Sequence, residues 1–168
     1  MSSQLLVKYS GGSSAKASYF RDGVLDCECQ AFIGKSGVGK EREGDGRTPL
    51  GTFRVRNAFG INPDPGTVFN YIHIGPGTIA CDEEGPYYNT IVDNIPCGGE
   101  KMLSLAPEYD FGLELDYNPG NVFPLGSAIF VHCKGAKPWT GGCVALDGPM
   151  MEHILRTADK ALEIKITI

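Results

Sequence analysis

The sequence predicts a mainly β domain, either a sandwich or a barrel-like fold, with roughly eight or nine strands and one or two helices. Three observations lead to this prediction. Short segments alternate between apolar and polar residues, which is typical of strands. The chain of 168 residues holds 23 Gly and 11 Pro without a repeat, and this excess of turn formers favours short elements. Only one segment, near the C-terminus, has the clear periodicity of a helix.

The first half of the chain is expected to hold strands joined by turns. Two or three antiparallel strands come within residues 4–9 and 17–33, with hairpin turns at 11–14 and 22–23. Residues 34–46 are rich in Gly and charged side chains and are expected to form an exposed loop. A rigid turn at 47–52 leads into the next strand, and another strand is expected at 68–74. Residues 75–99 are irregular.

The second half is expected to contain the remaining strands and both helices. Strands are predicted at 111–117, 128–131 and 144–146, with a closing strand over 162–168. The main helix follows Asp147, the expected N-cap, and has Pro149 in its first turn. Its apolar residues recur at helical spacing: Met150, Met151, Ile154, Leu155 and Ala158. A short second helix is expected within 100–106.

Length and charge limit the classes of function. A chain of this length is expected to form one domain, residues 1–168, whose core needs neither a metal nor a disulfide to fold. The net charge of −5 and the pI near 5.2, with Lys and Arg scattered, argue against nucleic acid or an anionic membrane as partner. No apolar run of about 18 residues occurs, so no membrane span is expected. We expect a monomer.

The N-terminal residues leave the location of the protein open. The stretch MSSQLLVKYS lacks the basic region, the long apolar segment and the cleavage site of a signal peptide. Either the protein is cytoplasmic, or the chain begins after a removed export segment.

Two local patterns resemble binding motifs without completing them. Gly34–Lys40 has the glycine spacing of a phosphate-binding loop, but Glu41 stands where a hydroxyl residue would hold magnesium, and no helical pattern follows. Cys27 and Cys29 are too close together for an ordinary zinc knuckle. We therefore expect no cofactor and no metal site.

The remaining Cys and His residues are expected to be structural. The six Cys, at positions 27, 29, 81, 97, 133 and 143, are too few for a disulfide scaffold. Most are expected to be small buried residues, and the sequence leaves the redox state of all but Cys143 open. His73 lies on an expected strand and His153 on the exposed side of the expected helix, so neither is expected to be catalytic.

The stretch from Ser127 to Leu146 contains the candidate catalytic residues. An apolar run, Ala128–Val131, leads to His132, and a loop then leads to Cys143 and a second apolar run. A free Cys is mostly protonated at neutral pH, but a neighbouring imidazole can take its proton and activate the sulfur. We therefore predict Cys143 as nucleophile and His132 as base. Taken singly, each is typical of a buried structural residue; it is their combination with Thr140-Gly141-Gly142 that favours a function.

The residues around the pair fit acyl transfer. Gly141 and Gly142 allow a tight turn, and the backbone N–H groups of Gly142 and Cys143 are expected to form an oxyanion hole. Thr140 is expected to cap the turn or to orient the loop. The imidazole also needs an orienting acceptor, for which we propose the carbonyl of Cys133.

These motifs resemble the L,D-transpeptidase (YkuD-type) catalytic domain family. The His132…Thr140-Gly141-Gly142-Cys143-Val144 pattern is similar to the family's His, spacer, Ser/Thr-x-Gly-Cys-Val signature, and Thr48-Pro49-Leu50-Gly51 to its Thr-Pro-x-Gly turn. Weaker landmarks are Pro86–Asn89, Gly99–Met102 and Tyr117-Asn118, so the resemblance covers about residues 30–168. It implies a β-sandwich of mixed sheets with one helix in the C-terminal region and a short second helix.

The resemblance also implies a substrate, a reaction and a location. Cys143 would attack a peptidoglycan tetrapeptide stem, form an acyl-enzyme and pass the acyl group to an amine, which makes a 3–3 cross-link or exchanges a D-amino acid. Carbapenem-type inhibitors would acylate the same sulfur, and the location would be extracytoplasmic. Tyr117, Asn118 and Trp139 are candidates for the substrate groove. An acidic groove of Asp82, Glu83, Glu84 and Glu100 would attract a cationic acceptor, although a solvated acidic face is the simpler interpretation.

The chain departs from the family's sequence pattern in two places, and two alternative functions remain open. Many members carry His and Arg where this chain has Gly141 and Ala145, and the spacing from His132 to Cys143 is short for the family. One alternative is a carboxypeptidase, an endopeptidase or another cysteine peptidase that hydrolyses cell-wall peptides. The other is a non-catalytic wall-binding module.

Overall fold

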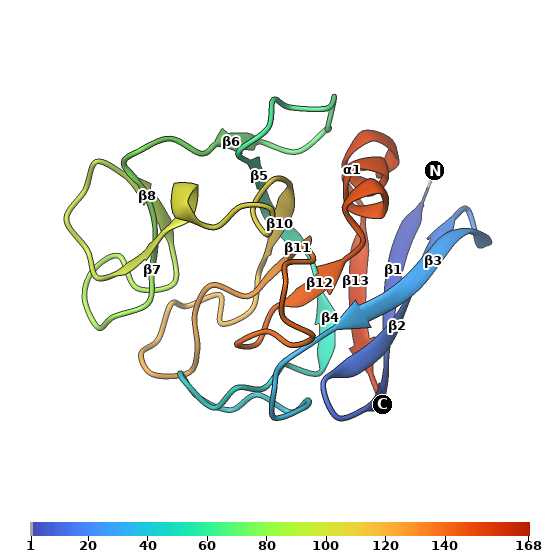
Figure 1. The fold of residues 1–168 in the computed structure, drawn as a ribbon, viewed down its shortest axis with the longest axis horizontal. Helices are drawn as coiled ribbons and strands as arrows, with labels where there is room; N and C mark the ends of the chain where they lie inside the picture. The colour runs from blue at the N-terminus through green and yellow to red at the C-terminus, as the bar shows by residue number, and fades with distance from the viewer. Residues whose placement is uncertain (1) are drawn as a thin grey trace.

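One mixed sheet of ten strands is the main element of the computed structural model, which describes residues 2–168 (Figure 1). The order across the sheet is β4-β13-β1-β2-β3-β12-β11-β10-β5-β6. Its strands are β1 (Ser3–Gly11), β2 (Ser14–Arg21), β3 (Val24–Phe32), β4 (Gly51–Phe53), β5 (Val55–Gly60), β6 (Tyr71–His73), β10 (Gly112–Leu115), β11 (Phe130–Cys133), β12 (Val144–Leu146) and β13 (Glu163–Thr167).

The N-terminal strands form as the alternation predicts. Leu5 and Val7 of β1 are fully buried while their neighbours face outward. β1, β2 and β3 pair antiparallel through the two expected turns, and β13 adds to β1 in parallel. Parallel pairing requires a long connection, and here the rest of the domain lies between the two strands in sequence.

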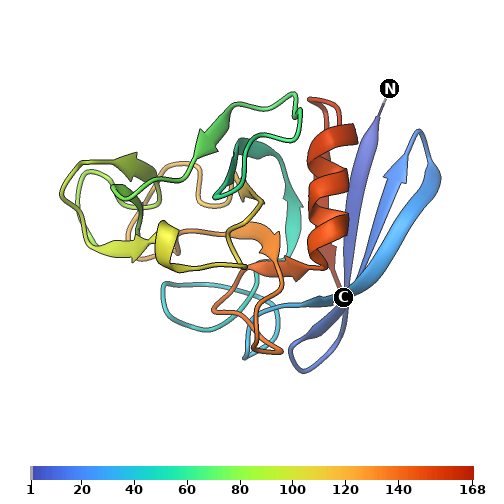
Figure 2. The ribbon, with the colours of Figure 1, turned by 45° about the horizontal axis from the view of Figure 1, so that its top comes forward.

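The helix α1 (Gly148–Thr157) packs against the large sheet. Figure 2 shows it with strands β1–β3 on one side and strands β5, β10, β11 and β12 on the other. Asp147 is at the N-cap position, but its side chain caps no N–H and instead pairs with Lys134 at 2.7 Å. The buried face of the helix contributes to a core shared with both halves of the sheet: Met150, Met151, Ile154 and Leu155.

A second, three-stranded sheet stands at the far end from β1–β3 (Figure 1). It consists of β7 (Thr78–Cys81), β8 (Ile91–Asp93) and β9 (Gly99–Lys101), and the short 3₁₀ helix η1 (Met102–Ser104) follows. A disulfide joins Cys81 to Cys97. The sequence left the redox state of these two residues open, and the fold decides it, because strand β7 brings Cys81 beside the turn that precedes β9.

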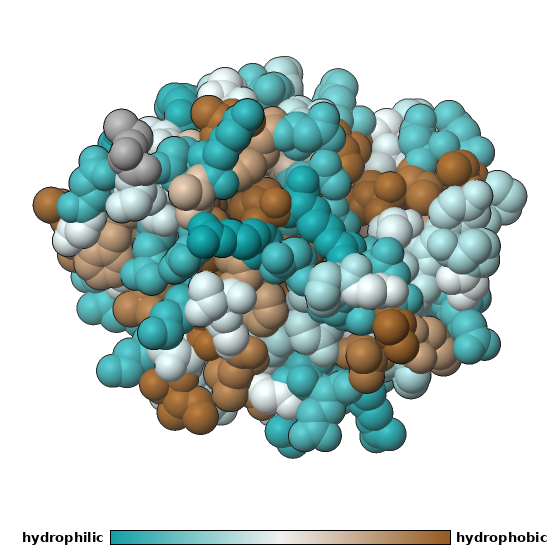
Figure 3. Space-filling view, turned by 180° about the vertical axis from the view of Figure 1, so that it is seen from behind, coloured by the Kyte–Doolittle hydropathy of each residue, from teal (hydrophilic) through white to brown (hydrophobic). Residues whose placement is uncertain are grey.

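The fold prediction is confirmed at the level of class and architecture. The protein is mainly β, with mixed sheets, one α-helix and a short second helix. Residues 2–168 contain thirteen strands, more than the roughly eight or nine expected from alternation, because several have only three residues and hold no periodic pattern. Within the described residues, no helix has the length and apolarity to cross a membrane. On the face drawn in Figure 3, apolar residues form small separate patches among polar ones.

The loop over 34–46 differs from the exposed loop that its composition predicts. Gly34 bridges to Thr140, and the N–H of Lys35 donates to the Thr140 carbonyl at 3.0 Å. A Cβ on Gly34 would lie 2.3 Å from the Gly46 carbonyl oxygen, so only glycine fits there. The loop therefore packs against the stretch that carries Cys143, and Gly34, Gly37 and Gly46 allow close contacts within and around it.

Candidate active site

Two neighbouring parallel strands position the His–Cys pair. β11 and β12 pair with Val131 opposite Val144 and His132 opposite Ala145. Side chains alternate along a strand, and Val131 and Val144 belong to the core beneath. His132 and Cys143 consequently face the opposite side of the sheet, where both line one cavity.

The imidazole of His132 is fixed through one nitrogen. Nδ1 lies 2.7 Å from the carbonyl oxygen of Cys133, and because a carbonyl only accepts, Nδ1 carries the proton and Nε2 is left as a base. The side chain is 7% exposed, and its burial lowers the pKa of His132, although the bond to Cys133 opposes this. The ring also meets the edge of Tyr109 at a centroid distance of 5.4 Å. The imidazole is therefore neutral at neutral pH.

The sulfur of Cys143 is held by the backbone of the stretch that leads into β11. The thiol donates to the Ala128 carbonyl at 3.1 Å, and the N–H of Phe130 donates to the sulfur at 3.3 Å. Ala128 has a positive φ of 54°, which is costly for a residue other than glycine. Burial raises the pKa of Cys143 to about 12, and the N–H of Phe130 opposes the rise. Among the described residues no hydrogen bond joins Cys143 to His132, so the thiol is protonated in this state.

Thr140 organises the loop before Cys143. Its hydroxyl accepts from the N–H of Gly142 at 3.0 Å and donates to the carbonyl of Cys143 at 2.7 Å. The N–H of Gly142 is thus already engaged, which differs from the oxyanion role expected for it. The N–H of Cys143 has no acceptor within the part of the chain that the structure describes.

The two glycines have different constraints. Gly142 has φ +151°, and a Cβ there would lie 2.9 Å from the Arg47 carbonyl oxygen. Gly141 has open space around its Cβ position and is exposed. A side chain is therefore sterically acceptable at 141 but not at 142.

A cavity of about 590 Å³ lies over the pair. Trp139 lines it and is 38% exposed. Tyr117 and Asn118 do not, which corrects the expectation for these two. The Tyr117 hydroxyl donates to the Leu125 carbonyl at 2.6 Å, and the Asn118 amide donates to the Val122 and Gly126 carbonyls at 3.0 Å each. Both side chains therefore hold the loop over 118–126 in place.

Comparison with known proteins identifies the family. The model of the YkuD family, described as the L,D-transpeptidase catalytic domain, matches residues 11–166. The chain belongs to the L,D-transpeptidase catalytic domain family. No curated protein sequence matches the chain.

Two solved L,D-transpeptidase structures share the fold. The Ldtfm–avibactam carbamoyl enzyme is 12% identical, with 99% of this chain and 49% of that one covered and a TM-score of 0.53. A cysteine-to-serine mutant of the Enterococcus faecium L,D-transpeptidase is 12% identical, with 99% and 50% covered and a TM-score of 0.51. This chain thus spans about half the length of these two proteins.

Lys40 is a pocket residue that the motifs of the family do not reveal. Its side chain is only 3% exposed, its ammonium is 2.9 Å from Asp45, and it lines the cavity. Asp45 also accepts from the N–H groups of Glu41, Arg42 and Arg47. Burial acts to raise the pKa of Asp45, but these bonds outweigh it and hold that pKa well below its usual range. The only sequence signal for Lys40 was the alternation of Gly and charged residues in the loop over 34–46.

Glu43 reaches the same cavity from the same loop. Its carboxylate accepts from the hydroxyls of Tyr88, at 2.7 Å, and Ser127, at 2.6 Å. The Tyr88 hydroxyl in turn accepts from the N–H of Gly126 at 2.9 Å. These bonds show that Tyr88 links Glu43 to the backbone of Gly126. The sequence had indicated Tyr88 only as part of the weak family landmark Pro86–Asn89.

The small sheet and the residue that follows β7 place two acidic side chains, Asp82 and Glu100, along one side of the cavity, here called the acidic wall. Asp82 and Glu100 line the cavity, whereas Glu83 and Glu84 do not, so only half of the expected acidic groove faces the pair. The Tyr109 hydroxyl donates to Glu100 at 2.7 Å. Burial raises the pKa of Glu100, and the charges of Asp82 and Glu43 add to the rise while the Tyr109 bond opposes it.

Proposed function

We propose that this protein is a peptidoglycan L,D-transpeptidase that forms an acyl-enzyme on Cys143 with a tetrapeptide stem. The observation that carries the proposal is the fixed imidazole: the bond of 2.7 Å between Nδ1 and the Cys133 carbonyl leaves Nε2 as the base of a cavity that Cys143 also lines. Membership of the L,D-transpeptidase family supports the same assignment.

The first half-reaction follows from the state of the two groups. Because burial keeps the Cys143 thiol protonated, its proton moves to Nε2 of His132 as the sulfur leaves the Ala128 carbonyl and attacks the stem carbonyl. The N–H of Cys143, which has no acceptor among the described residues, donates to the developing oxyanion. The C–N bond to the terminal D-alanine then breaks, and the imidazolium returns its proton to the leaving amine.

The second half-reaction passes the acyl group on. An acceptor amine gives its proton to Nε2, attacks the thioester and releases the Cys143 thiolate, which takes the proton back from Nε2 and restores the starting pair. A second stem as acceptor yields a 3–3 cross-link, a free D-amino acid yields exchange, and water yields carboxypeptidase activity. Hydrolysis is the second candidate function because the cavity is open enough for water beside a fixed base.

An oxidising location outside the cytoplasm fits this substrate. Disulfides persist in secreted and extracytoplasmic proteins and are rare in the cytosol, and the chain holds the Cys81–Cys97 bridge. The proposed site of action is therefore the cell wall or periplasm.

Covalent labelling by a carbapenem tests the nucleophile. Intact-protein mass spectrometry is expected to show one adduct, mapped by peptide analysis to Cys143 and absent in Cys143→Ala. Cys29→Ser is the matched control, because Cys29 is another half-buried free thiol, and it should label like the parent. His132→Ala is expected to remain folded and to lose activity, since removing a general base typically costs about a hundredfold or more. A parent protein that stays unmodified under conditions that acylate a known member would contradict the proposal.

Incubation with muropeptides and a free D-amino acid distinguishes the reactions. Exchange or 3–3 dimers detected by mass spectrometry support transfer, and tripeptide alone supports hydrolysis. Binding of muropeptides without any product, unchanged in Cys143→Ala, would identify a wall-binding module instead.

A further inference from the structure

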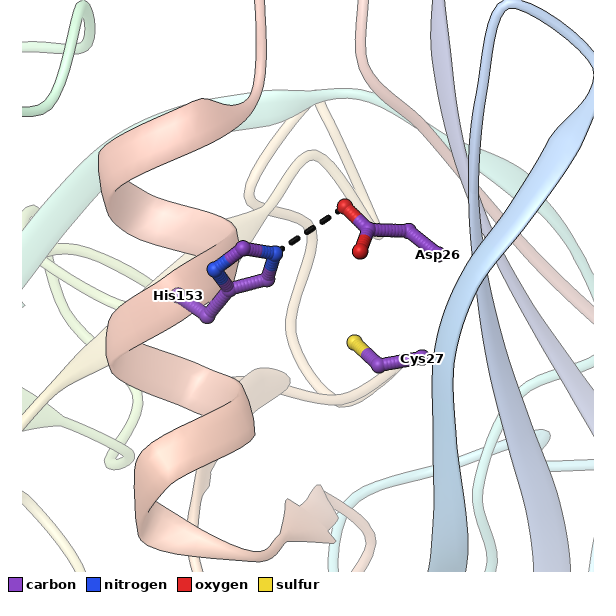
Figure 4. Close-up of side chains that lie close together, drawn as sticks. All are labelled: Asp26, Cys27 and His153. Carbon is purple, nitrogen blue, oxygen red and sulfur yellow. Dashed lines mark hydrogen bonds and ion pairs between the residues drawn. The ribbon is translucent and has the colours of Figure 1, made fainter.

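A cluster of three metal-ligating side chains lies away from the active site, between strand β3 and helix α1 (Figure 4). The side chains are those of Asp26, Cys27 and His153, and one ligand atom from each lies within 4.8 Å of the other two. His153 Nε2 is 3.0 Å from Asp26 Oδ2. None of the three lines the cavity of the proposed active site, so the proposed mechanism makes no use of them.

A β-bulge explains how two consecutive strand residues face the same helix. Tyr19 of β2 pairs with Cys27, but Phe20 pairs with Leu25, so Asp26 has no partner in the ladder. Consecutive side chains of a regular strand point to opposite faces, and a bulge re-aims one of them. Figure 4 shows both side chains directed from the strand towards His153 on α1.

We propose that Asp26, Cys27 and His153 bind a zinc ion that joins strand β3 to helix α1. A carboxylate, a thiolate and an imidazole are the ligands that zinc prefers, and a fourth position is left for water. Tetrahedral zinc with these bond lengths separates its ligand atoms by about 3.2–3.7 Å. The Asp26–His153 distance of 3.0 Å is already close to this range, and a small movement of the Cys27 side chain completes the set.

The surroundings of the cluster support binding. The side chains of Asp26 and His153 are 25% and 37% exposed, so an ion reaches them from solvent. Arg21 Nη1 lies 3.5 Å from Asp26, and Arg21 Nε is the single buried side-chain nitrogen or oxygen within residues 2–168 that has no hydrogen-bond partner. Arg21 Nη1 contacts the same oxygen, Oδ2, that contacts His153, so zinc on Oδ2 requires the Arg21 guanidinium to turn to Oδ1, where an outer donor of this kind orients a ligating carboxylate. Cys27 gives up its proton to solvent as the ion binds.

The proposal differs from the zinc knuckle that the sequence excluded. That motif would have used Cys27 with Cys29, whereas Cys29 is not among the side chains whose ligand atoms lie together in this cluster. The neighbouring Cys29 is therefore a matched control rather than a ligand.

Cobalt(II) spectroscopy tests the site. The experiment uses the full chain carrying Cys143→Ala, which removes the thiol of the proposed active site. Oxygen is excluded so that Cys27 stays reduced, and added thiols are excluded so that the Cys81–Cys97 bridge stays intact. We expect one equivalent of cobalt to produce a sulfur-to-cobalt charge-transfer absorption, and zinc to displace it. Cys27→Ser should abolish the absorption, Asp26→Asn and His153→Gln should weaken binding at least about tenfold, and Cys29→Ser should bind like its parent.

A thermal measurement keeps the test decisive if one variant folds poorly. Zinc is expected to raise the unfolding midpoint of the parent, because it binds the folded state and joins two elements, and to leave that of Cys27→Ser unchanged. An absent charge-transfer band in the parent, a band that survives Cys27→Ser, or a band lost in Cys29→Ser would overturn the proposal. Since all proteins lack Cys143, these outcomes are independent of transpeptidase activity.

Discussion

Lys40 brings a positive charge to the thiol from a loop far upstream in the chain. Many family members have His and Arg beside the nucleophile, where this chain has Gly141 and Ala145. A Cβ on Gly142 would lie 3.6 Å from the Lys40 ammonium, so this charge stands beside the residue that precedes Cys143. Burial raises the pKa of Cys143, and Lys40 acts to lower it. The lysine therefore supplies electrostatic support that the flanking positions lack.

Replacing Lys40 by methionine should slow the thiol. Without the ammonium the pKa of Cys143 rises further, so less thiolate exists at any pH below it, and alkylation of Cys143 at pH 8 is expected to fall, by less than about tenfold because burial and the Phe130 N–H act more strongly on this pKa than Lys40 does. The pH–rate profile, measured by mass spectrometry with a small alkylating agent, should shift to higher pH.

A fold check and a control variant separate this effect from unfolding. In Lys40→Met the Asp45 carboxylate loses its cation but keeps its bonds to the N–H groups of Glu41, Arg42 and Arg47, so circular dichroism is expected to show a folded protein. Lys35→Met removes an exposed charge from the same loop and should react like the parent. A folded Lys40→Met protein that alkylates at the parent rate would show that the charge has no part in activation.

At the level of elements, the disulfide secures the sheet that carries the acidic wall. Cys81 ends β7, and its bridge to Cys97 spans 16 residues of chain, with Asp82 inside the closed loop and Glu100 just beyond it. Closing a loop of this length stabilises by about 3 kcal/mol in the chain-entropy description. The small sheet has only three short strands, so it depends on the bridge more than the large sheet does.

Removing the bridge should therefore loosen one element selectively. In the double variant Cys81→Ser/Cys97→Ser, amide hydrogen exchange over residues 78–101 is expected to accelerate by about a hundredfold, which corresponds to about 3 kcal/mol of local stability. Exchange in β1–β3 should stay as in the parent. Equal acceleration in both regions would mean that the bridge stabilises the whole domain.

Sequence patterns predicted the elements whose residues carry periodicity or a motif. Alternation identified β1 and β13, a continuous apolar run identified β11, helical spacing identified α1, and the motif placed His132 and Cys143 at the ends of neighbouring strands. The same patterns missed contacts that depend on tertiary structure. Lys40 and Glu43 lie in a loop whose composition predicts exposure, Asp26 faces α1 because of a bulge, and the Cys81–Cys97 pairing has no signature in the spacing of the six Cys.

At the level of the whole molecule, one core joins both halves of the large sheet. Buried residues of β1 and β2 belong to the same cluster as those of β10, β11 and β12, and α1 lies among them. The active site stands on the outer face of β11 and β12, so its geometry depends on the packing of the helix beneath. The domain is consequently expected to unfold in a single transition.

Met151→Ala tests this coupling. Met151 is fully buried on α1, and its truncation should lower the free energy of unfolding by about 2–5 kcal/mol. Urea unfolding is followed by far-UV circular dichroism, which reports the strands, and by the fluorescence of Trp139, the one Trp of the chain, which reports the cavity. Both curves should shift together and remain superimposed. Leu103→Ala is the control, since that exposed side chain on η1 should change stability by less than about 0.5 kcal/mol. If the fluorescence transition separated from the circular dichroism transition, the active-site stretch would be unfolding independently of the core that supports it.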